Sequence, residues 1–143
     1  MFFEELQQGM TRTLLPVTVE REEMLDFAKK YDNVPLHTDE AAAAKTPFGR
    51  LLAPGVLSFL LVWAKYLEQD FFGEQLLAGT STTIEWLRLV FAEDVLTGTA
   101  QVTKLQERSP RSGLATLELR AFNQNGEHVL TGTVCAVIKR KNT

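Results

Sequence analysis

The chain has 143 residues, a length that suits one domain with a core of its own. Hydrophobic residues make up 45% and charged residues 23%, near the globular average, so a wholly disordered chain is excluded. The formal net charge is −3 and no long basic block is present, which argues against a nucleic-acid partner.

The chain begins with a predicted strand and a predicted helix. Thr11 to Val19 is rich in β-branched residues, which favours a strand, and Pro16 favours a place at the edge of the sheet. Glu20 to Lys30 has apolar side chains at helical spacing, with acids in the first turn that suit the helix dipole. We therefore expect a short amphipathic helix directly after the first strand.

A turn-rich stretch follows from Tyr31 to His37. Pro35 disfavours the helical region for the residue before it, which predicts a loop. Thr38-Asp39 can then cap a small helix that runs from Ala41 to Ala44.

The most apolar segment lies between Gly49 and Gly73. Pro54 and Gly55 mark a helix start and Gly73 marks a stop, which gives a helix roughly 27 Å long at about 1.5 Å per residue. From Val56 to Ala64 the side chains are apolar on almost every face, so other structure must surround this helix.

The second half of the chain predicts four strands. Apolar side chains alternate with polar or small ones, as expected of strands with one buried face. The connections are short, and Asn125-Gly126 is a strong hairpin signal, so the last three strands form an antiparallel meander. The four candidates are Thr80 to Phe91, Val95 to Leu105, Leu114 to Phe122 and Val129 to Ile138.

One long apolar helix together with an antiparallel sheet of long strands indicates an α+β architecture. We expect the sheet to curl around the helix, as in the hot-dog fold, within one domain that covers residues 1–143. Such a sheet leaves an edge strand that can pair with a second copy, which predicts a homodimer or a higher homo-oligomer.

Cysteine use and hydropathy bear on cofactors and location. The single cysteine, Cys135, excludes an internal disulfide framework and a cysteine-rich zinc site, so we expect neither a metal nor another cofactor. The first residues lack the basic segment of a secretory signal, and the run from Val56 to Ala64 is too short to span a bilayer. These patterns predict a cytoplasmic protein with no membrane partner.

Two histidines are present, His37 and His128. His128 follows the Asn125-Gly126 turn, and its better interpretation is a solvent-exposed hairpin residue. His37 lies in the proline-containing loop, with Asp32 upstream. On the residues alone, Asp32 is interpreted as a surface acid at a helix end and His37 as a loop residue, and a catalytic pair is the alternative.

The stretch from Tyr31 to Asp39 resembles the hydratase signature of the MaoC-like dehydratases, which include the (R)-specific enoyl-CoA hydratases. The family pattern of Asp, any residue, Asn, Pro, any residue and His aligns with residues 32–37. The segment from Thr46 to Gly55 is similar to the family's lead-in to its central helix, and Glu85 to Arg88 and Gly126 to Gly132 are similar to later strands. The resemblance covers nearly the whole chain.

Three positions depart from the common family pattern. Tyr31 stands where many members have Gly, and Pro54 replaces the usual His, Ser or Gln. Val34 stands where Asn is usual. The side chain of Asn can form hydrogen bonds that position the loop and that of Val cannot, so this departure bears on the level of activity.

The resemblance implies that Asp32 and His37 hold one water molecule for addition to a 2-enoyl thioester of coenzyme A or of an acyl carrier protein. One group takes a proton from the water while the other delivers a proton to the α-carbon, and the division of these roles stays open because coupled groups titrate as a pair. Gly55 begins the central helix, so its N–H has no partner within the helix and can stabilise the enolate-like oxygen.

Other polar side chains near these segments have plainer interpretations. Ser58 falls in the first turn of the central helix, where a capping or packing role is the better interpretation. Lys45, Arg50 and Arg88 could meet a CoA phosphate, although surface charge is the better interpretation for each.

Three function classes remain open. The first is a hydratase or dehydratase of acyl thioesters. The second is a hot-dog thioesterase, which would place a catalytic carboxylate on the central helix, where Val56 to Lys65 contains none. The third is a non-catalytic acyl-CoA-binding protein, which Val34 keeps open.

Overall fold

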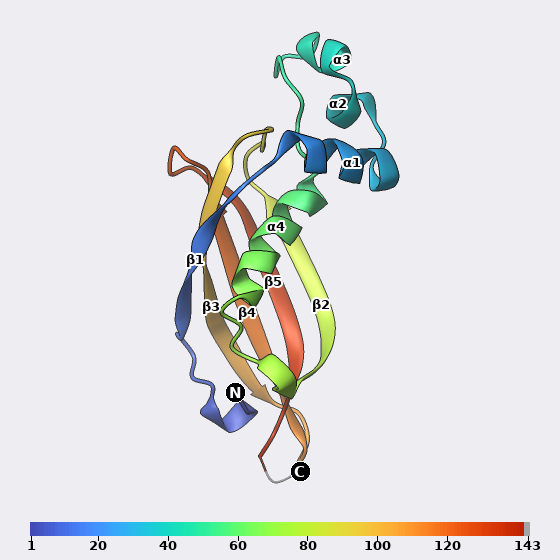
Figure 1. Ribbon diagram of the computed structural model, residues 1–143. Helices are drawn as coiled ribbons and strands as arrows, with labels where there is room; N and C mark the ends of the chain where they lie inside the picture. The colour runs from blue at the N-terminus through green and yellow to red at the C-terminus, as the bar shows by residue number, and fades with distance from the viewer. Residues whose placement is uncertain (142–143) are drawn as a thin grey trace.

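The computed structural model describes residues 1–141 and contains a five-stranded antiparallel sheet that curls around one helix (Figure 1). The helix, α4 (Gly55–Leu67), lies along the concave face of the sheet. This is the predicted α+β hot-dog architecture, and residues 142 and 143 of the predicted domain lie outside the described residues. The strand order is β1-β3-β4-β5-β2, formed by β1 (Thr11–Thr18), β2 (Leu76–Trp86), β3 (Val95–Glu107), β4 (Ser112–Phe122) and β5 (His128–Lys139).

The predicted meander is confirmed, since β3, β4 and β5 are neighbours in the sheet and pair antiparallel. The β4–β5 connection is closed by a hydrogen bond from the Asn123 N–H to the Glu127 carbonyl and contains Gly126 at φ 74°. It is thus longer than a two-residue hairpin turn. β1 is an edge strand, as Pro16 predicts.

The core lies between α4 and the concave face of the sheet. Alternate residues of the central strands are buried because successive side chains of a strand point to opposite faces. One side of α4 meets them with Leu57, Phe59, Val62 and Tyr66, all of them buried.

The central helix is shorter than predicted. It ends at Leu67 instead of reaching Gly73, so its 13 residues span about 20 Å. The Asp70 carboxylate accepts hydrogen bonds from the Tyr66 hydroxyl and from the N–H groups of Phe72 and Gly73, which fixes a turn there. Burial and then the bond to Asp70 raise the pKa of Tyr66 well above its usual value, so the phenol keeps its proton.

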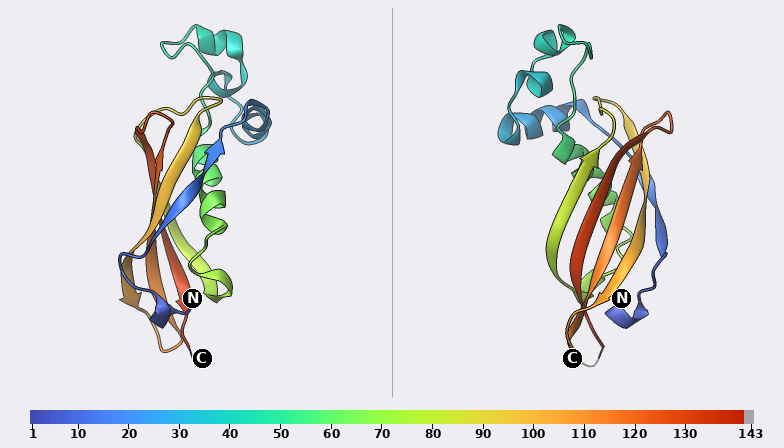
Figure 2. Two further views of the ribbon diagram at one scale, coloured as in Figure 1. Left: turned by 60° about the vertical axis from the view of Figure 1, so that its left-hand side comes forward. Right: turned by 180° about the vertical axis from the view of Figure 1, so that it is seen from behind.

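Three further helices cluster beyond one end of the sheet, while the N-terminus and the end of β5 lie at the opposite end (Figure 2). They are α1 (Arg21–Tyr31), α2 (Pro35–Thr38) and α3 (Glu40–Ala44), and short 3-10 turns occur at Phe3–Glu5 and Gly73–Gln75. An ion pair between Arg21 and Glu40 joins α1 to α3. The cluster lies close to the N-terminal end of α4.

The predicted loop from Tyr31 to His37 is only partly irregular. Pro35 occupies the first position of α2, where its missing N–H costs nothing, so a short helix forms there. Asp39 caps α3 as predicted, because its side chain accepts a hydrogen bond from the Ala42 N–H.

The predicted strand from Thr80 to Phe91 is shifted toward the N-terminus. β2 ends at Trp86, and the N–H groups of Leu87 and Arg88 both point to the Val129 carbonyl, at 2.8 and 3.3 Å. Residues 87–91 therefore leave the sheet. Phe91 then pairs in an isolated bridge with Leu52, which lies in the segment that leads into α4. None of the helices within residues 1–141 is both long and apolar enough to cross a bilayer.

Close packing against α4 leads to a first prediction. A Cβ atom on Gly132 of β5 would lie 2.6 Å from the ring of Phe59, so Gly132→Ala should lower the free energy of unfolding by about 1–3 kcal/mol. Chemical denaturation measures this loss. The matched control is Gly79→Ala on β2, where a Cβ atom meets nothing within 4 Å and stability should change little. Equal stability of the two variants would contradict the packing described.

Candidate active site

The ends of α1 and α2 bring Asp32 and His37 together. Asp32 closes α1, where its N–H bonds to the Ala28 carbonyl, and His37 lies on α2. His37 Nε2 is 3.4 Å from Asp32 Oδ2. The imidazole is largely buried, with 13% of its side chain exposed, whereas 45% of the Asp32 side chain is exposed. The pair therefore has a protected half and a half open to incoming molecules.

The loop between the two residues is held by backbone hydrogen bonds. The Val34 N–H donates to the Asp32 carbonyl at 2.9 Å, and the Val34 carbonyl accepts from the His37 N–H at 2.9 Å. The Thr38 hydroxyl also donates to the Val34 carbonyl. The side chain of Val34 is exposed and takes no part in these bonds. The loop is therefore shaped without the side-chain hydrogen bonds that Asn would offer at this position.

The orientation of the imidazole is set by one carbonyl. His37 Nδ1 lies 2.7 Å from the Leu52 carbonyl oxygen, an acceptor, so Nδ1 carries a proton and donates it. The Leu52 N–H donates in turn to the Leu36 carbonyl. Nε2 is thereby left to face Asp32.

Gly55 begins α4, after the buried Pro54. Its carbonyl accepts hydrogen bonds from the Ser58 hydroxyl at 2.7 Å and from Trp86 Nε1 at 2.9 Å. A Cβ atom on Gly55 would lie 2.5 Å from the Trp86 indole, so only glycine fits under this ring. As the first residue of the helix, Gly55 has an N–H without an intrahelical acceptor.

Asp32, His37 and Gly55 all line one cavity of about 300 Å³. A polar end formed by the pair and a helix N-terminus thus lies beside an apolar wall. The apolar wall is formed by Leu52, Ala53, Val56, Trp86, Leu89 and Val90, and the polar Ser58 and Arg88 also line the cavity. A carboxyl group and an imidazole are side chains able to exchange protons, and beside a positively polarised helix terminus such groups have the chemistry needed to act on a polarised double bond.

Several lining residues come from positions that the sequence pattern assigns elsewhere. Leu89 and Val90 were expected in a strand, but they belong to the segment that leaves the sheet after β2. Arg88 is exposed, as expected of surface charge, yet it also lines the cavity. Ser58 is fully buried and bonds within the first helical turn, which agrees with its packing interpretation.

His128 differs from its prediction as a solvent-exposed residue. It is half-buried, its ring stacks on Phe122, and Nε2 lies 2.9 Å from the Leu130 carbonyl and 3.0 Å from the Thr131 hydroxyl. His128 is the first residue of β5, so its ring lies against the strands and not in the turn. His128 therefore has a structural role in the hairpin.

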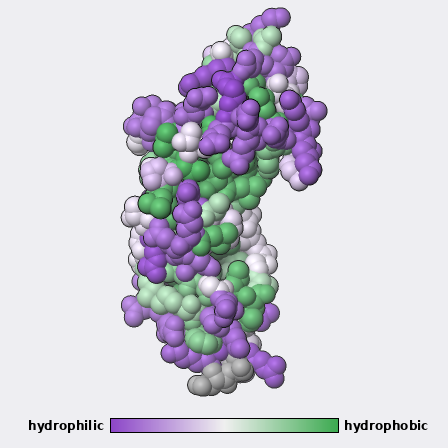
Figure 3. Space-filling model, in the orientation of Figure 1, coloured by the Kyte–Doolittle hydropathy of each residue, from purple (hydrophilic) through white to green (hydrophobic). Residues whose placement is uncertain are grey.

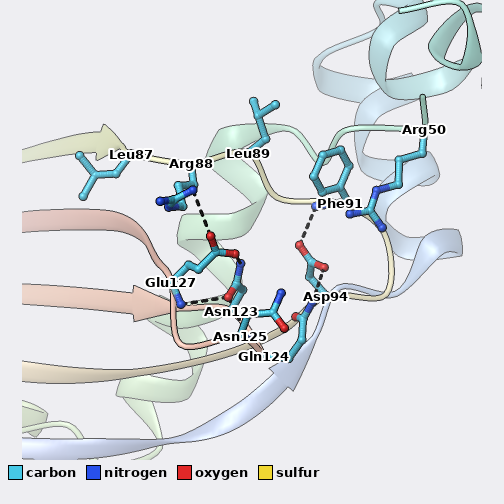
Figure 4. Close-up of a pocket in the computed structure, with 10 residues that line it drawn as sticks. All are labelled: Arg50, Leu87, Arg88, Leu89, Phe91, Asp94, Asn123, Gln124, Asn125 and Glu127. Carbon is cyan, nitrogen blue, oxygen red and sulfur yellow. Dashed lines mark hydrogen bonds and ion pairs between the residues drawn. The ribbon is translucent and has the colours of Figure 1, made fainter. Parts of the chain in front are cut away.

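A second, more polar groove adjoins the cavity (Figure 4). It has a volume of about 420 Å³ and shares Arg88 and Leu89 with the cavity. Its other lining residues are Arg50, Leu87, Phe91, Asp94, Asn123, Gln124, Asn125 and Glu127. Within the described part of the chain, no three His, Cys, Asp or Glu side chains gather as a set of metal ligands.

Comparison with known proteins identifies the family. The family model described as "MaoC like domain" matches residues 4–121, which is most of the chain. The chain belongs to the MaoC-like family.

Relatives of this MaoC-like protein carry several descriptions. The (R)-specific enoyl-CoA hydratase of Aeromonas caviae is 37% identical over 106 residues, which cover 73% of each chain. A solved (R)-hydratase from A. caviae, described as involved in PHA biosynthesis, has a TM-score of 0.77 at 32% identity and covers 96% of this chain and 98% of that one. An Archaeoglobus structure described as a monoamine oxidase regulatory protein has a TM-score of 0.92 at 32% identity, covering 99% and 95%.

The two histidines should adopt opposite neutral tautomers. His37 donates through Nδ1 to the Leu52 carbonyl and His128 through Nε2 to the Leu130 carbonyl, because a carbonyl oxygen accepts but never donates. Long-range ¹H–¹⁵N NMR correlation, at a pH where both rings are neutral, distinguishes the protonated nitrogen of each ring. A neutral His37 protonated at Nε2 would mean that Leu52 does not orient the ring.

Proposed function

We propose that this MaoC-like protein is a hydratase or dehydratase of enoyl and 3-hydroxyacyl thioesters. The observation that carries the proposal is the convergence of Asp32, His37 and Gly55 on one cavity. The sequence relationship to an (R)-specific enoyl-CoA hydratase supports it independently. The proposal needs no metal or other cofactor, and it keeps the cytoplasmic location expected from the sequence.

In the proposed reaction Asp32 and His37 hold one water molecule between them. One group removes a proton from the water as its oxygen attacks the β-carbon, and the other delivers a proton to the α-carbon. Nδ1 of His37 is engaged by Leu52, so Nε2 is the ring atom that exchanges a proton with water or substrate. The exposed half of Asp32 gives the substrate access to the pair.

The thioester carbonyl is proposed to bind at the N-terminus of α4. Addition to the double bond places negative charge on this oxygen, and the free N–H of Gly55 and the helix dipole stabilise that charge. Pro54 lacks an N–H, so Gly55 is the donor at this point of the chain. The Trp86 and Ser58 bonds to the Gly55 carbonyl hold the peptide in place before substrate arrives.

We also propose that the protein is a homodimer. The outward side of α4 is apolar and exposed, with Val56 at 48%, Leu60 at 41% and Leu67 at 46% exposure. Figure 3 shows hydrophobic side chains gathered where α4 runs. The sequence predicts that other structure surrounds α4, but the sheet of the same chain covers only one side of the helix. The adjacent β2 is an edge strand with further exposed apolar residues, so a second copy can cover both.

A non-catalytic acyl-CoA-binding protein is the alternative, and Val34 is the observation that favours it. A thioesterase is less well supported, since α4 carries no Asp or Glu between Gly55 and Leu67. An assay with crotonyl-CoA in the presence of a chelator separates the three classes. Loss of the double bond indicates a hydratase, release of thiol indicates a thioesterase, and binding without reaction indicates a carrier or sensor.

The dyad variants test the mechanism directly. Asp32→Asn and His37→Ala should each lower kcat by about 10²–10⁴-fold, because each removes a group that moves a proton in the transition state. The double variant should be hardly slower than either single one, since groups that act as a unit are not additive. Steady-state kinetics with crotonyl-CoA measure these rates, and binding of the thioester should persist.

Val34→Asn is the companion variant. It restores the common family residue at the position that caps α2, so activity should rise or stay unchanged. Wild-type rates in both Asp32→Asn and His37→Ala, with binding retained, would replace the hydratase by the acyl-thioester binder.

The dimer is tested by a charge on the exposed side of α4. Leu60→Asp should weaken self-association in sedimentation equilibrium, because a carboxylate would be buried without a partner at the interface. The matched control is Leu15→Asp on β1, where the replaced leucine is 59% exposed on the opposite edge of the sheet. A wild-type monomer at micromolar concentration, or a dimer broken only by Leu15→Asp, would contradict this assembly.

A further inference from the structure

We propose that Asp94, which does not line the cavity, is a positioning residue for the pair formed by Asp32 and His37. The turn that Asp94 closes attaches both members of the pair to the sheet. No proton transfer is assigned to Asp94 itself. The inference deepens the proposed function, and its kinetic test rests on that function.

Asp94 is a buried carboxylate in the turn that precedes β3, with 4% of the residue exposed. Its Oδ2 atom accepts from the Phe91 N–H at 2.9 Å, and its Oδ1 atom accepts from the side-chain amide of Gln124 at 3.0 Å (Figure 4). Both donors are uncharged. Burial of a carboxylate costs free energy, and its hydrogen bonds offset that cost only while their geometry is kept. The carboxylate therefore fixes Phe91 and the β4–β5 connection relative to the start of β3.

The turn that contains Asp94 is strained. Glu93 has a φ of 75°, in the left-handed region that favours glycine. The Asp94 N–H donates to the Phe91 carbonyl, so this bond and the one from the Phe91 N–H to the carboxylate close the turn together. A residue keeps such a conformation only where surrounding contacts outweigh the strain, and these conformations are concentrated at functional sites. The turn is thus held in one shape against the local preference of its residues.

His37 is attached to this turn through Phe91. Phe91 pairs with Leu52 in the isolated bridge. Beside the bridge, the Ala53 N–H donates to the Val90 carbonyl at 2.8 Å. The Leu52 carbonyl in turn accepts the Nδ1 proton of His37. A shift of Phe91 would therefore move the carbonyl that orients the imidazole.

Asp32 is attached to the same turn through Val19, the fully buried residue that follows β1. The Val19 N–H donates to the Asp94 carbonyl at 2.8 Å, and the Val19 carbonyl accepts from the Glu93 N–H at 2.7 Å. α1 begins two residues later, at Arg21, whose guanidinium lies 3.6 Å from the Glu93 carboxylate. The helix that Asp32 closes is therefore anchored at its start to the turn.

The kinetics of Asp94 variants with crotonyl-CoA test this role. Asp94→Ala should lower kcat by about 10–100-fold, because a small misplacement of reacting groups has effects of this size. KM should stay nearly unchanged, since the residues that line the cavity are all retained. Asp94→Asn keeps an oxygen that can accept from the Phe91 N–H, so it should recover most of the rate.

The matched control is Asp70→Ala. Asp70 also closes a turn by accepting from two backbone N–H groups, but it lies beyond the C-terminal end of α4. This variant should lose stability while kcat stays at the wild-type value, with all rates compared at a temperature where both variants are folded. Equal losses of kcat in Asp70→Ala and Asp94→Ala, or a wild-type kcat in Asp94→Ala, would overturn the proposal.

The ring of His37 gives a second readout, which does not require turnover. Long-range ¹H–¹⁵N correlation should show that the neutral ring becomes a mixture of tautomers in Asp94→Ala and stays protonated at Nδ1 in Asp70→Ala. If Asp94→Ala fails to fold, Gln124→Glu replaces it. This change at an exposed residue places a second carboxylate against Asp94 Oδ1, and like charges repel, so the ring should change in the same direction.

The NMR result separates this proposal from the proposed function. A His37 ring that stays protonated at Nδ1 in the folded Asp94 or Gln124 variant would overturn the positioning role. A wild-type protein that does not hydrate crotonyl-CoA, together with a changed His37 ring in the variant, would defeat the proposed reaction and leave the positioning role standing.

Discussion

The attachment of the N-terminus of α4 to the end of β2 is the constraint on which the rest of the site depends. The Gly55 carbonyl accepts from Trp86 Nε1 and from the Ser58 hydroxyl, so the helix start is bonded both to the sheet and to its own first turn. The Ala53 N–H, two residues earlier, donates to the Val90 carbonyl beyond β2. These bonds require the indole to lie against the helix backbone, which is possible because Gly55 has no side chain. The position of the free N–H of Gly55 follows from this packing.

Asp32 and His37 are held by the same segment, through Leu52, the residue before Ala53. The Leu52 carbonyl accepts the His37 proton at Nδ1, so the segment that leads into α4 also orients the imidazole. Asp32 and His37 then keep their separation through the backbone bonds around Val34. The helix cluster beyond the sheet shares the core of the molecule through Met24 and Ala43, which are fully buried. It is attached to the lead-in to α4 through His37 and Leu52, and the ion pair between Arg21 and Glu40 joins two of its helices to each other.

The regular parts of this structure were predictable from local sequence, and the irregular parts depended on tertiary contacts. The alternation in β3, β4 and β5 and the apolar run of α4 were sufficient for the hot-dog architecture, and the motif around Asp32 and His37 marked the segment that lines the cavity. The end of α4 was misjudged because Gly73 was interpreted as the stop, whereas the helix ends at Leu67 and Asp70 fixes a turn before Gly73. The point at which residues 87–91 leave the sheet could not be predicted from the sequence either. It depends on a tertiary contact, in which the Val129 carbonyl accepts from two N–H groups. That exit contributes Arg88 and Leu89 to both the cavity and the polar groove, whereas surface charge was the better interpretation of Arg88 from the sequence.

The structure of the loop reduces the importance of the valine that stands at position 34 in place of the usual asparagine. A side-chain hydrogen bond at this position is valuable where the loop would otherwise be free to move. Here the N–H and the carbonyl of Val34 both form hydrogen bonds within the loop. Pro35 restricts the backbone further, because its ring fixes its own φ and disfavours the helical region for Val34. The separation of Asp32 and His37 therefore follows from backbone geometry that valine satisfies as well as asparagine does. What distinguishes an enzyme from a binding protein at this site is the ability of the pair to transfer protons, and the exposed side chain of Val34 takes no part in the hydrogen bonds that hold the loop.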